Sequence, residues 1–252
     1  MRRAPLAFAL AALPLLAGQP LIYQDGSVKL AGYVARPGSV AGTVPGVLVI
    51  HQWMGLTGHE RTVADRLAAL GYVALAADIY GEGIRPANVK EAAAQATVYK
   101  GDRALYRRRI RAGLEALKAQ AGVDPGRIAV IGFCFGGTGA LEAARAGMPV
   151  AGVVSFHGGL DAVPDPEARP ITAKVLVCHG ADDPNVPPRD VAAFQDEMRR
   201  TKADYTFIAY GGAVHAFTQK EAGNDPSKGF AYQEAAAQRS WQHMKDFFSI
   251  IF

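Results

Sequence analysis

The sequence has few cysteines and no apolar run of transmembrane length. Its 252 residues contain two cysteines, Cys134 and Cys178, too few for a disulfide framework. No cluster of His, Cys, Asp and Glu has metal-site spacing, and no glycine-rich stretch has phosphate-loop spacing, so we expect neither a metal nor another cofactor. Internal repeats and low-complexity linkers are also lacking, which predicts one domain after the N-terminal segment.

Net charge is low as well. The formal value of +4 falls to +2 if Arg2 and Arg3 are removed with that N-terminal segment, which leaves little reason to expect a nucleic-acid partner. The densest basic cluster, Arg107 to Arg109 with Arg111, falls in a helical stretch, and we interpret it as a solvated helix face. Hydrophobic residues make up 50% of the chain, enough for a sizeable core.

The first 18 residues have the form of a secretory signal peptide. A short basic start precedes an apolar run over 4–16 and the small pair Ala17-Gly18. Leu15 or Leu16 would lie where the cleavage site prefers a small residue, and a membrane anchor or a buried helix is the alternative. We therefore predict that residues 19–252 form a single secreted or periplasmic domain, with no membrane contact after cleavage.

Apolar runs alternate with amphipathic stretches along the remaining chain. This alternation predicts parallel strands joined by crossover helices, preceded by a hairpin at Asp25-Gly26. The predicted strands cover 21–23, 28–34, 47–50, 73–77, 128–131, 150–155, 175–178 and 205–209; the predicted helices cover 59–70, 88–100, 102–120, 138–147, 189–200 and 231–248. Because the loop over 160–170 is short, we predict an α/β fold with a mostly parallel sheet flanked by helices and no separate lid domain.

The most informative stretch is Arg127 to Gly139, with the sequence RIAVIGFCFGGTG. Its Gly-x-Cys-x-Gly, between a predicted strand and a predicted helix, is typical of the nucleophile elbow of an α/β-hydrolase. The turn strains Cys134, and side chains at Gly132 and Gly136 would collide with the strand or the helix. The helix N-terminus would lower the thiol pKa. The alternative is that Cys134 is merely a small buried residue in a tight turn.

Asp183 and His215 follow Cys134 in the order of a hydrolase triad, each beyond the end of a predicted strand. The thiolate would attack a carbonyl, His215 would move the proton, and Asp183 would hold the imidazole in the required tautomer. Asp182 is the alternative acid. We prefer Asp183 because it begins the turn sequence Asp-Pro-Asn-Val-Pro, which would fix its direction.

The predicted oxyanion hole consists of two backbone N–H groups. Phe135 directly follows the nucleophile, and Trp53 lies in the loop after the strand at 47–50, although plain packing at the strand end is its alternative. We predict that Gln52, Tyr80 and Phe217 contact the substrate.

The remaining histidines and Cys178 have simpler interpretations. The sequence predicts that His51 and His179 satisfy local backbone groups and that His59 and His243 lie at the surface; His157 is a candidate for lining the cleft, but nothing in the sequence makes it a ligand. Cys178 is expected in the core, and a disulfide with Cys134 is the alternative.

From Gly46 onward the chain resembles the dienelactone hydrolase family. The motifs that carry the resemblance occur in order over some 170 residues: HQWMG at 51–55, ADIY at 77–80, GFCFGG at 132–137, GADDPNVP at 180–187 and HAF at 215–217. The resemblance implies an α/β-hydrolase fold, no cofactor, and a triad of Cys134, Asp183 and His215 that acts on esters or lactones.

Three positions depart from the family pattern. Gln52 stands where a glutamate commonly helps to generate the thiolate, and Gln219 and Glu82 stand where arginines bind the dienelactone carboxylate, with Arg85 close to the latter. We therefore predict a monomeric hydrolase that cleaves small esters or lactones through a thioester, with a substrate other than that dienelactone. A general carboxylesterase without lactone preference and a non-catalytic binding protein are the alternatives.

Overall fold

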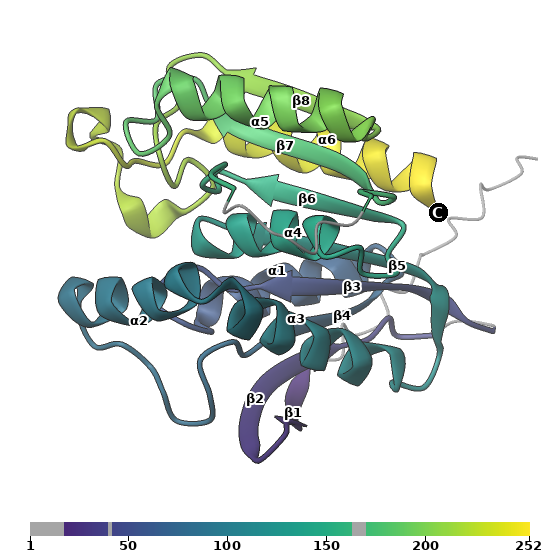
Figure 1. Cartoon of the computed structure of the whole chain (residues 1–252). Helices are drawn as coiled ribbons and strands as arrows, with labels where there is room; N and C mark the ends of the chain where they lie inside the picture. The colour runs from purple at the N-terminus through teal and green to yellow at the C-terminus, as the bar shows by residue number, and fades with distance from the viewer. Residues whose placement is uncertain (1–17, 40–41, 163–169) are drawn as a thin grey trace, which may run out of the picture.

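The computed structural model describes residues 18–39, 42–162 and 170–252, and within these ranges eight strands form one sheet (Figure 1). The strand order is β1-β2-β4-β3-β5-β6-β7-β8, with β1, β2 and β4 paired antiparallel and all other neighbours parallel. The strands are β1 (Gln19–Asp25), β2 (Val28–Ala35), β3 (Val44–Ile50), β4 (Val73–Ala77), β5 (Val123–Phe133), β6 (Gly152–Phe156), β7 (Lys174–Gly180) and β8 (Tyr205–Tyr210). The predicted, mostly parallel sheet is thus confirmed.

The predicted hairpin joins β1 to β2. Asp25 pairs with Val28, and the turn between them places Gly26 at φ +59°, in the left-handed region that glycine adopts readily.

Helices cover both faces of the sheet (Figure 1). α1 and α6 pack on one face, and α2, α3, α4 and α5 pack on the other. Their bounds are α1 (Gly58–Ala69), α2 (Val89–Gly101), α3 (Arg103–Lys118), α4 (Phe135–Arg145), α5 (Pro188–Thr201) and α6 (Glu234–Ile251), and the short 3₁₀ helices η1 (Lys220–Ala222) and η2 (Pro226–Lys228) lie between β8 and α6.

The central strands are buried on both sides, which explains their continuous apolar sequences. In β3, Leu48 and Ile50 face the core under α3 and α4, whereas Val47 and Val49 face the core under α1 and α6. The alternating direction of side chains along a strand therefore divides a single apolar run between two cores.

The break between α2 and α3 falls where the sequence predicts it. Gly101 ends α2, and the Asp102 side chain accepts a hydrogen bond from the N–H of Leu105 at 2.8 Å, which caps α3.

The basic cluster on α3 is only partly a solvated face. Arg108 and Arg111 are exposed, as predicted, but Arg109 is buried against Asp25 of the hairpin. Arg107 donates from Nε to Glu142 of α4 at 2.9 Å. The prediction is wrong for Arg107 and Arg109 because α3 packs between β1 and α4, and both of those elements supply carboxylates.

No separate lid domain is found in the described ranges, although part of the predicted loop, residues 163–169, lies outside them. The predicted signal peptide also lies outside them, apart from Gly18. Among the helices that the structure describes, none is long and apolar enough to cross a membrane.

Candidate active site

The strand-to-helix turn at Cys134 has the sharp geometry that its sequence predicts. β5 ends at Phe133, α4 begins at Phe135, and Cys134 between them adopts φ +54° and ψ −115°. A Cβ on Gly132 would lie 1.9 Å from the carbonyl oxygen of Gly136, and a Cβ on Gly136 would lie 2.2 Å from that of Ile50. Both glycines are therefore required sterically.

A hydrogen-bonded chain connects the three predicted triad residues. The Sγ of Cys134 lies 3.0 Å from Nε2 of His215, whose Nδ1 lies 2.8 Å from Oδ2 of Asp183. The other oxygen of Asp183 accepts a hydrogen bond from the N–H of Asn185 at 2.8 Å, so the turn after β7 orients this carboxylate. Asp182 instead accepts from the N–H of Gly212, so it is directed away from His215.

The environment of the pair favours a thiolate beside an imidazolium. Burial disfavours the charged form of both groups, but their mutual attraction and hydrogen bond outweigh it, with Phe135 N–H adding to the effect on the sulfur. The pKa of Cys134 consequently lies below its ordinary value, and that of His215 rises to about 10 with a further contribution from Asp183.

His157 lies directly behind Cys134, a position that the sequence does not reveal. It is fully buried, its Nδ1 accepts from the N–H of Cys134 at 3.1 Å, and its Nε2 lies 2.8 Å from Oγ1 of Thr218. Burial lowers the pKa of His157 well below its usual value, so the ring is neutral, with its proton on Nε2. It does not line the cleft, because β6 and the loop after β8 enclose it.

The predicted oxyanion donors lie on two different elements: Phe135 is the first residue of α4, and Trp53 lies in the loop after β3. Phe135 N–H is directed at the sulfur of Cys134. Trp53 N–H makes no hydrogen bond to any described residue, while its carbonyl accepts from the hydroxyl of Tyr80 at 2.9 Å. The hydrogen bond from Tyr80 holds the loop after β3 in place and leaves the N–H of Trp53 available.

Gln52 is held by its own loop and by α1. Its Oε1 accepts from the N–H of Met54 at 2.9 Å, and its N–H donates to Oε1 of the fully buried Glu60 at 3.2 Å. No hydrogen bond joins Gln52 to Cys134 within the described chain. Glu60 is a further residue that we did not predict, although the capping box Thr57-x-x-Glu60 is a recognisable sequence signal for it.

Two predicted substrate contacts are almost entirely buried. Tyr80 is 2% exposed, and its ring packs against Tyr99 and Phe135. Phe217 has no exposed surface and packs against His157 and Tyr210 in the core under α6. Phe217 is therefore a core residue that packs beneath His157.

The structure confirms some of the simpler interpretations and corrects others. His51 bonds to the backbone of Gln52 and Ile79, as predicted, whereas Nδ1 of the buried His179 has no partner among the described residues. His59 and His243 are half-buried and not surface residues, because they contact Phe133 and Tyr210, respectively. Cys178 is a free thiol in the core, and so is not bonded to Cys134.

No free arginine stands at the positions that depart from the family pattern. Glu82 is exposed, and Nε2 of Gln219 is buried without a described partner. Arg85 forms an ion pair with the buried Asp78 at 3.3 Å.

Cys134, Asp183 and His215, in this chain order and at the carboxyl edge of a mostly parallel sheet, have the arrangement of an α/β-hydrolase. The chain belongs to the dienelactone hydrolase family, whose model matches residues 30–252. It is therefore a hydrolase.

Individual relatives agree with this assignment. A probable 2-oxo-3-(5-oxofuran-2-ylidene)propanoate lactonase from Bradyrhizobium sp is 32% identical over 87% of this chain and 88% of its own length. The crystal structure of the dienelactone hydrolase-like promiscuous phosphotriesterase P91, from metagenomic libraries, is 42% identical with a TM-score of 0.89, covering 93% of this chain and 98% of that one. A dienelactone hydrolase from Anabaena variabilis, 22% identical with a TM-score of 0.63 over 91% of this chain and 98% of its own, shares the fold.

Proposed function

We propose that this protein hydrolyses small carboxylic esters or lactones through a covalent thioester on Cys134. The observation that supports this most directly is the chain of short contacts from Cys134 Sγ through His215 to Asp183, at 3.0 and 2.8 Å. The family supplies the reaction class, and this chain of contacts supplies the nucleophile and the proton carrier.

In the first half of the reaction, the Cys134 thiolate attacks the carbonyl carbon and the carbonyl oxygen becomes an oxyanion. The N–H groups of Trp53 and Phe135 stabilise that oxyanion. His215 then donates its Nε2 proton to the leaving alkoxide, the C–O bond breaks, and an acyl thioester remains. In a lactone the alcohol stays attached to the acyl group.

In the second half, neutral His215 removes a proton from water, which attacks the thioester carbonyl. The C–S bond breaks, the acid leaves, and the thiolate–imidazolium pair is restored. Asp183 supports both halves because it accepts from Nδ1 of His215 and stabilises the imidazolium.

Activation of the thiol does not require Gln52. Its amide oxygen is occupied by the N–H of Met54, while His215 contacts the sulfur directly. Burial raises the pKa of Cys134, but the adjacent His215 lowers it below the ordinary value, so the histidine partner supplies the activation that a glutamate commonly supplies in the family.

The positions at which the family binds a substrate carboxylate carry no free cation in this chain. Glu82 is a carboxylate, Gln219 is neutral, and Arg85 is already paired with Asp78, so none of these side chains offers a free cation to a substrate carboxylate. Neutral aryl or alkyl esters and simple lactones fit this site better than an anionic dienelactone does.

We also propose that the mature domain, residues 19–252, acts as a secreted or periplasmic monomer. The basic and then apolar start of the sequence supports this location. N-terminal sequencing of the exported protein would test it.

The decisive experiment compares Cys134→Ala with Cys178→Ala, using p-nitrophenyl acetate and γ-butyrolactone as substrates. We expect Cys134→Ala to lose activity to the background rate and Cys178→Ala to keep it, since Cys178 lies in the core. Intact-mass measurement during turnover should show an acetyl adduct on the wild-type protein but not on Cys134→Ala. Full activity of Cys134→Ala would exclude the mechanism.

The same assays separate the alternatives. A general carboxylesterase would show no preference for the lactone over the aryl ester when the two rates are compared side by side. A non-catalytic binding protein would hydrolyse neither substrate, and Gln52→Glu would not restore activity.

A further inference from the structure

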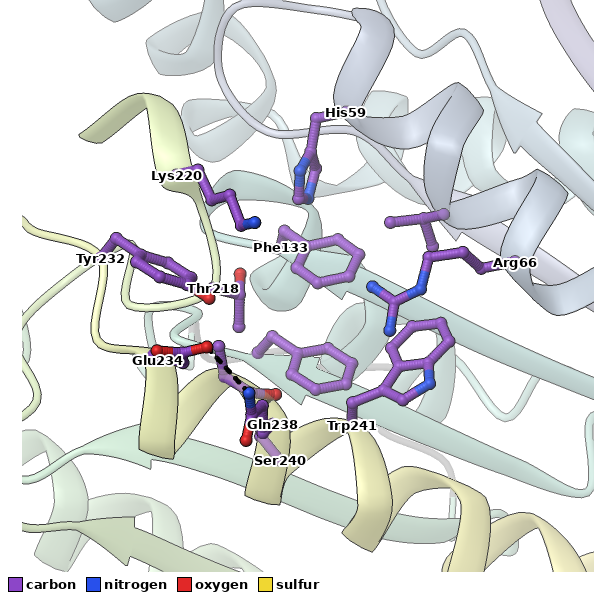
Figure 2. Close-up of a pocket in the computed structure, with 13 residues that line it drawn as sticks. His59, Arg66, Phe133, Thr218, Lys220, Tyr232, Glu234, Gln238, Ser240 and Trp241 are labelled. Carbon is purple, nitrogen blue, oxygen red and sulfur yellow. Dashed lines mark hydrogen bonds between the residues drawn. The ribbon is translucent and has the colours of Figure 1, made fainter. Parts of the chain in front are cut away.

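A second pocket lies beside the catalytic residues, between α1 and α6 and next to the loop that leads into η1 (Figure 2). Its volume is about 260 Å³, and neither Cys134, Asp183 nor His215 lines it. Thr218, which lines the pocket, is also the hydrogen-bond partner of His157 behind the nucleophile. The pocket is therefore separate from the reacting atoms but adjacent to them.

The interior of this pocket is aromatic. Phe133 and Phe156 stack with ring centroids 4.8 Å apart at the ends of β5 and β6, and Trp241 of α6 forms a side wall. Such surfaces favour a flat, unsaturated ligand, because stacked or edge-on ring contacts add to the gain from apolar burial.

Arg66 and Lys220 give the walls of the pocket a positive charge. Neither side chain forms an ion pair with a carboxylate of the described chain. The guanidinium of Arg66 lies 3.8 Å from the centroid of the Trp241 ring and makes no ion pair with any described residue. Lys220 extends from η1 over Tyr232 at 5.9 Å. The carboxylate that lines the pocket, Glu234, is exposed and accepts a hydrogen bond from Gln238 of its own helix at 3.0 Å.

His59 adds an unused polar atom to this wall. Its Nε2 is buried and has no hydrogen-bond partner among the described residues, and its ring meets Phe133 edge-on at 4.9 Å. In Figure 2, His59 and Lys220 both extend toward the space beside Phe133. A buried nitrogen without a partner is costly unless a ligand or water satisfies it, so its position indicates a polar atom of a ligand.

We propose that this pocket binds a small aromatic or otherwise flat organic carboxylate. The rings of Phe133, Phe156 and Trp241 hold the planar body. The carboxylate lies toward His59, Arg66 and Lys220, where charge-assisted hydrogen bonds are strongest. The site is distinct from the catalytic cleft and does not depend on the proposed hydrolysis.

The test is a titration of Trp53→Phe protein with benzoate, followed by fluorescence. The sequence contains two tryptophans, so Trp241 is then the sole tryptophan reporter. We expect saturable quenching, and binding of neutral benzamide should be about tenfold weaker because it lacks the charge. Absence of saturation with benzoate, or equal affinity for benzamide, would overturn the proposal.

Substitutions then locate the ligand. In the same background, Arg66→Gln should weaken benzoate binding about three- to fivefold and Lys220→Gln about threefold, the range of a partly exposed ion pair. Arg61→Gln is the matched control: it removes a cation from the same helix, but Arg61 lies over Tyr33, outside the pocket. Thermal melting of each variant would show that the fold is retained.

Blocking the catalytic cleft separates the two sites. Protein carboxymethylated at Cys134 should bind benzoate with unchanged affinity, because Cys134 does not line the pocket. If carboxymethylation abolished benzoate binding and Arg66→Gln left the benzoate affinity unchanged, benzoate would bind in the catalytic cleft. That result would refute a second site.

Discussion

The charge of the Cys134–His215 pair is the residue-scale property on which reactivity depends. Burial alone would leave a neutral thiol beside a neutral imidazole, because a low dielectric disfavours ions. The contact of 3.0 Å between the two groups and the carboxylate of Asp183 reverse that outcome.

We predict a bell-shaped dependence of kcat/KM on pH. Activity should rise as the pH rises through the lowered pKa of Cys134, since the thiolate is the nucleophile. It should fall as the pH rises through about 10, since His215 must be protonated to release the alcohol. Ester hydrolysis measured from about pH 5 to 11 would check both limbs, and an alkaline limb near the ordinary pKa of histidine would contradict the ion-pair description.

The two neighbouring aspartates provide a matched pair of variants. Asp183→Asn removes the acceptor on Nδ1 of His215 and should lower kcat by about 10²- to 10⁴-fold, the usual contribution of positioned acid–base catalysis. It should also move the alkaline limb to lower pH, because Asp183 raises the pKa of His215. Asp182→Asn should retain activity, since that carboxylate is bonded to Gly212. Equal losses in the two variants would show that Asp183 has no special role.

At the scale of elements, the strand-to-helix turn at Cys134 depends on close backbone approach. A Cβ at Gly136 would lie 2.2 Å from the carbonyl oxygen of Ile50, a backbone atom that cannot rotate away. The strand β3 and the helix α4 would have to move apart, and the proposed oxyanion donors, Phe135 and Trp53, lie on α4 and on the loop that follows β3. A side chain at position 136 would therefore lower both the stability of the fold and the rate of catalysis.

We predict that Gly136→Ala lowers the free energy of unfolding by about 3 kcal/mol or more, at the upper end of the usual cost of overpacking. Gly58→Ala is the control, because a Cβ at this first position of α1 meets nothing within 4 Å. It should be neutral or stabilising by about 0.4–1 kcal/mol. Urea denaturation would measure the free energy of unfolding of both variants. If Gly136→Ala lowered it no more than Gly58→Ala does, the two backbones would not approach each other so closely.

Elements and the order of site residues could be predicted from the sequence because they follow local patterns. Continuous apolar runs predict buried strands, and Cys134, Asp183 and His215 all lie beyond strand ends, which a parallel sheet brings to one edge. Contacts between distant segments could not be predicted. His157 contacts Cys134 and Thr218 only because β6 lies beside β5, and Phe217 looks like a pocket residue until the packing of α6 buries it.

At the scale of the whole molecule, a buried network of charges connects three helices on one face of the sheet. Glu142 of α4 is fully buried and contacts Arg145 at 3.0 Å and Arg107 of α3 at 2.9 Å. Arg145 in turn pairs with Glu197 of α5 at 2.7 Å. Burial alone would lower the pKa of Arg145, but its two carboxylate partners raise it, so the guanidinium stays charged in the interior.

Removing the central carboxylate should therefore destabilise the whole domain. We predict that Glu142→Ala costs about 3–5 kcal/mol of unfolding free energy, because it removes the buried carboxylate that Arg107 and Arg145 share. Glu115→Ala on α3 is the control: it breaks an exposed pair with Lys118 and should cost at most about 1 kcal/mol. Urea denaturation of both variants would test this, and similar small costs would mean that water or the remaining partner Glu197 satisfies Arg145.

If the network holds the three helices as one unit, Glu142→Ala should also broaden the unfolding transition in urea, since α5 could then separate from α3 and α4 before the sheet unfolds.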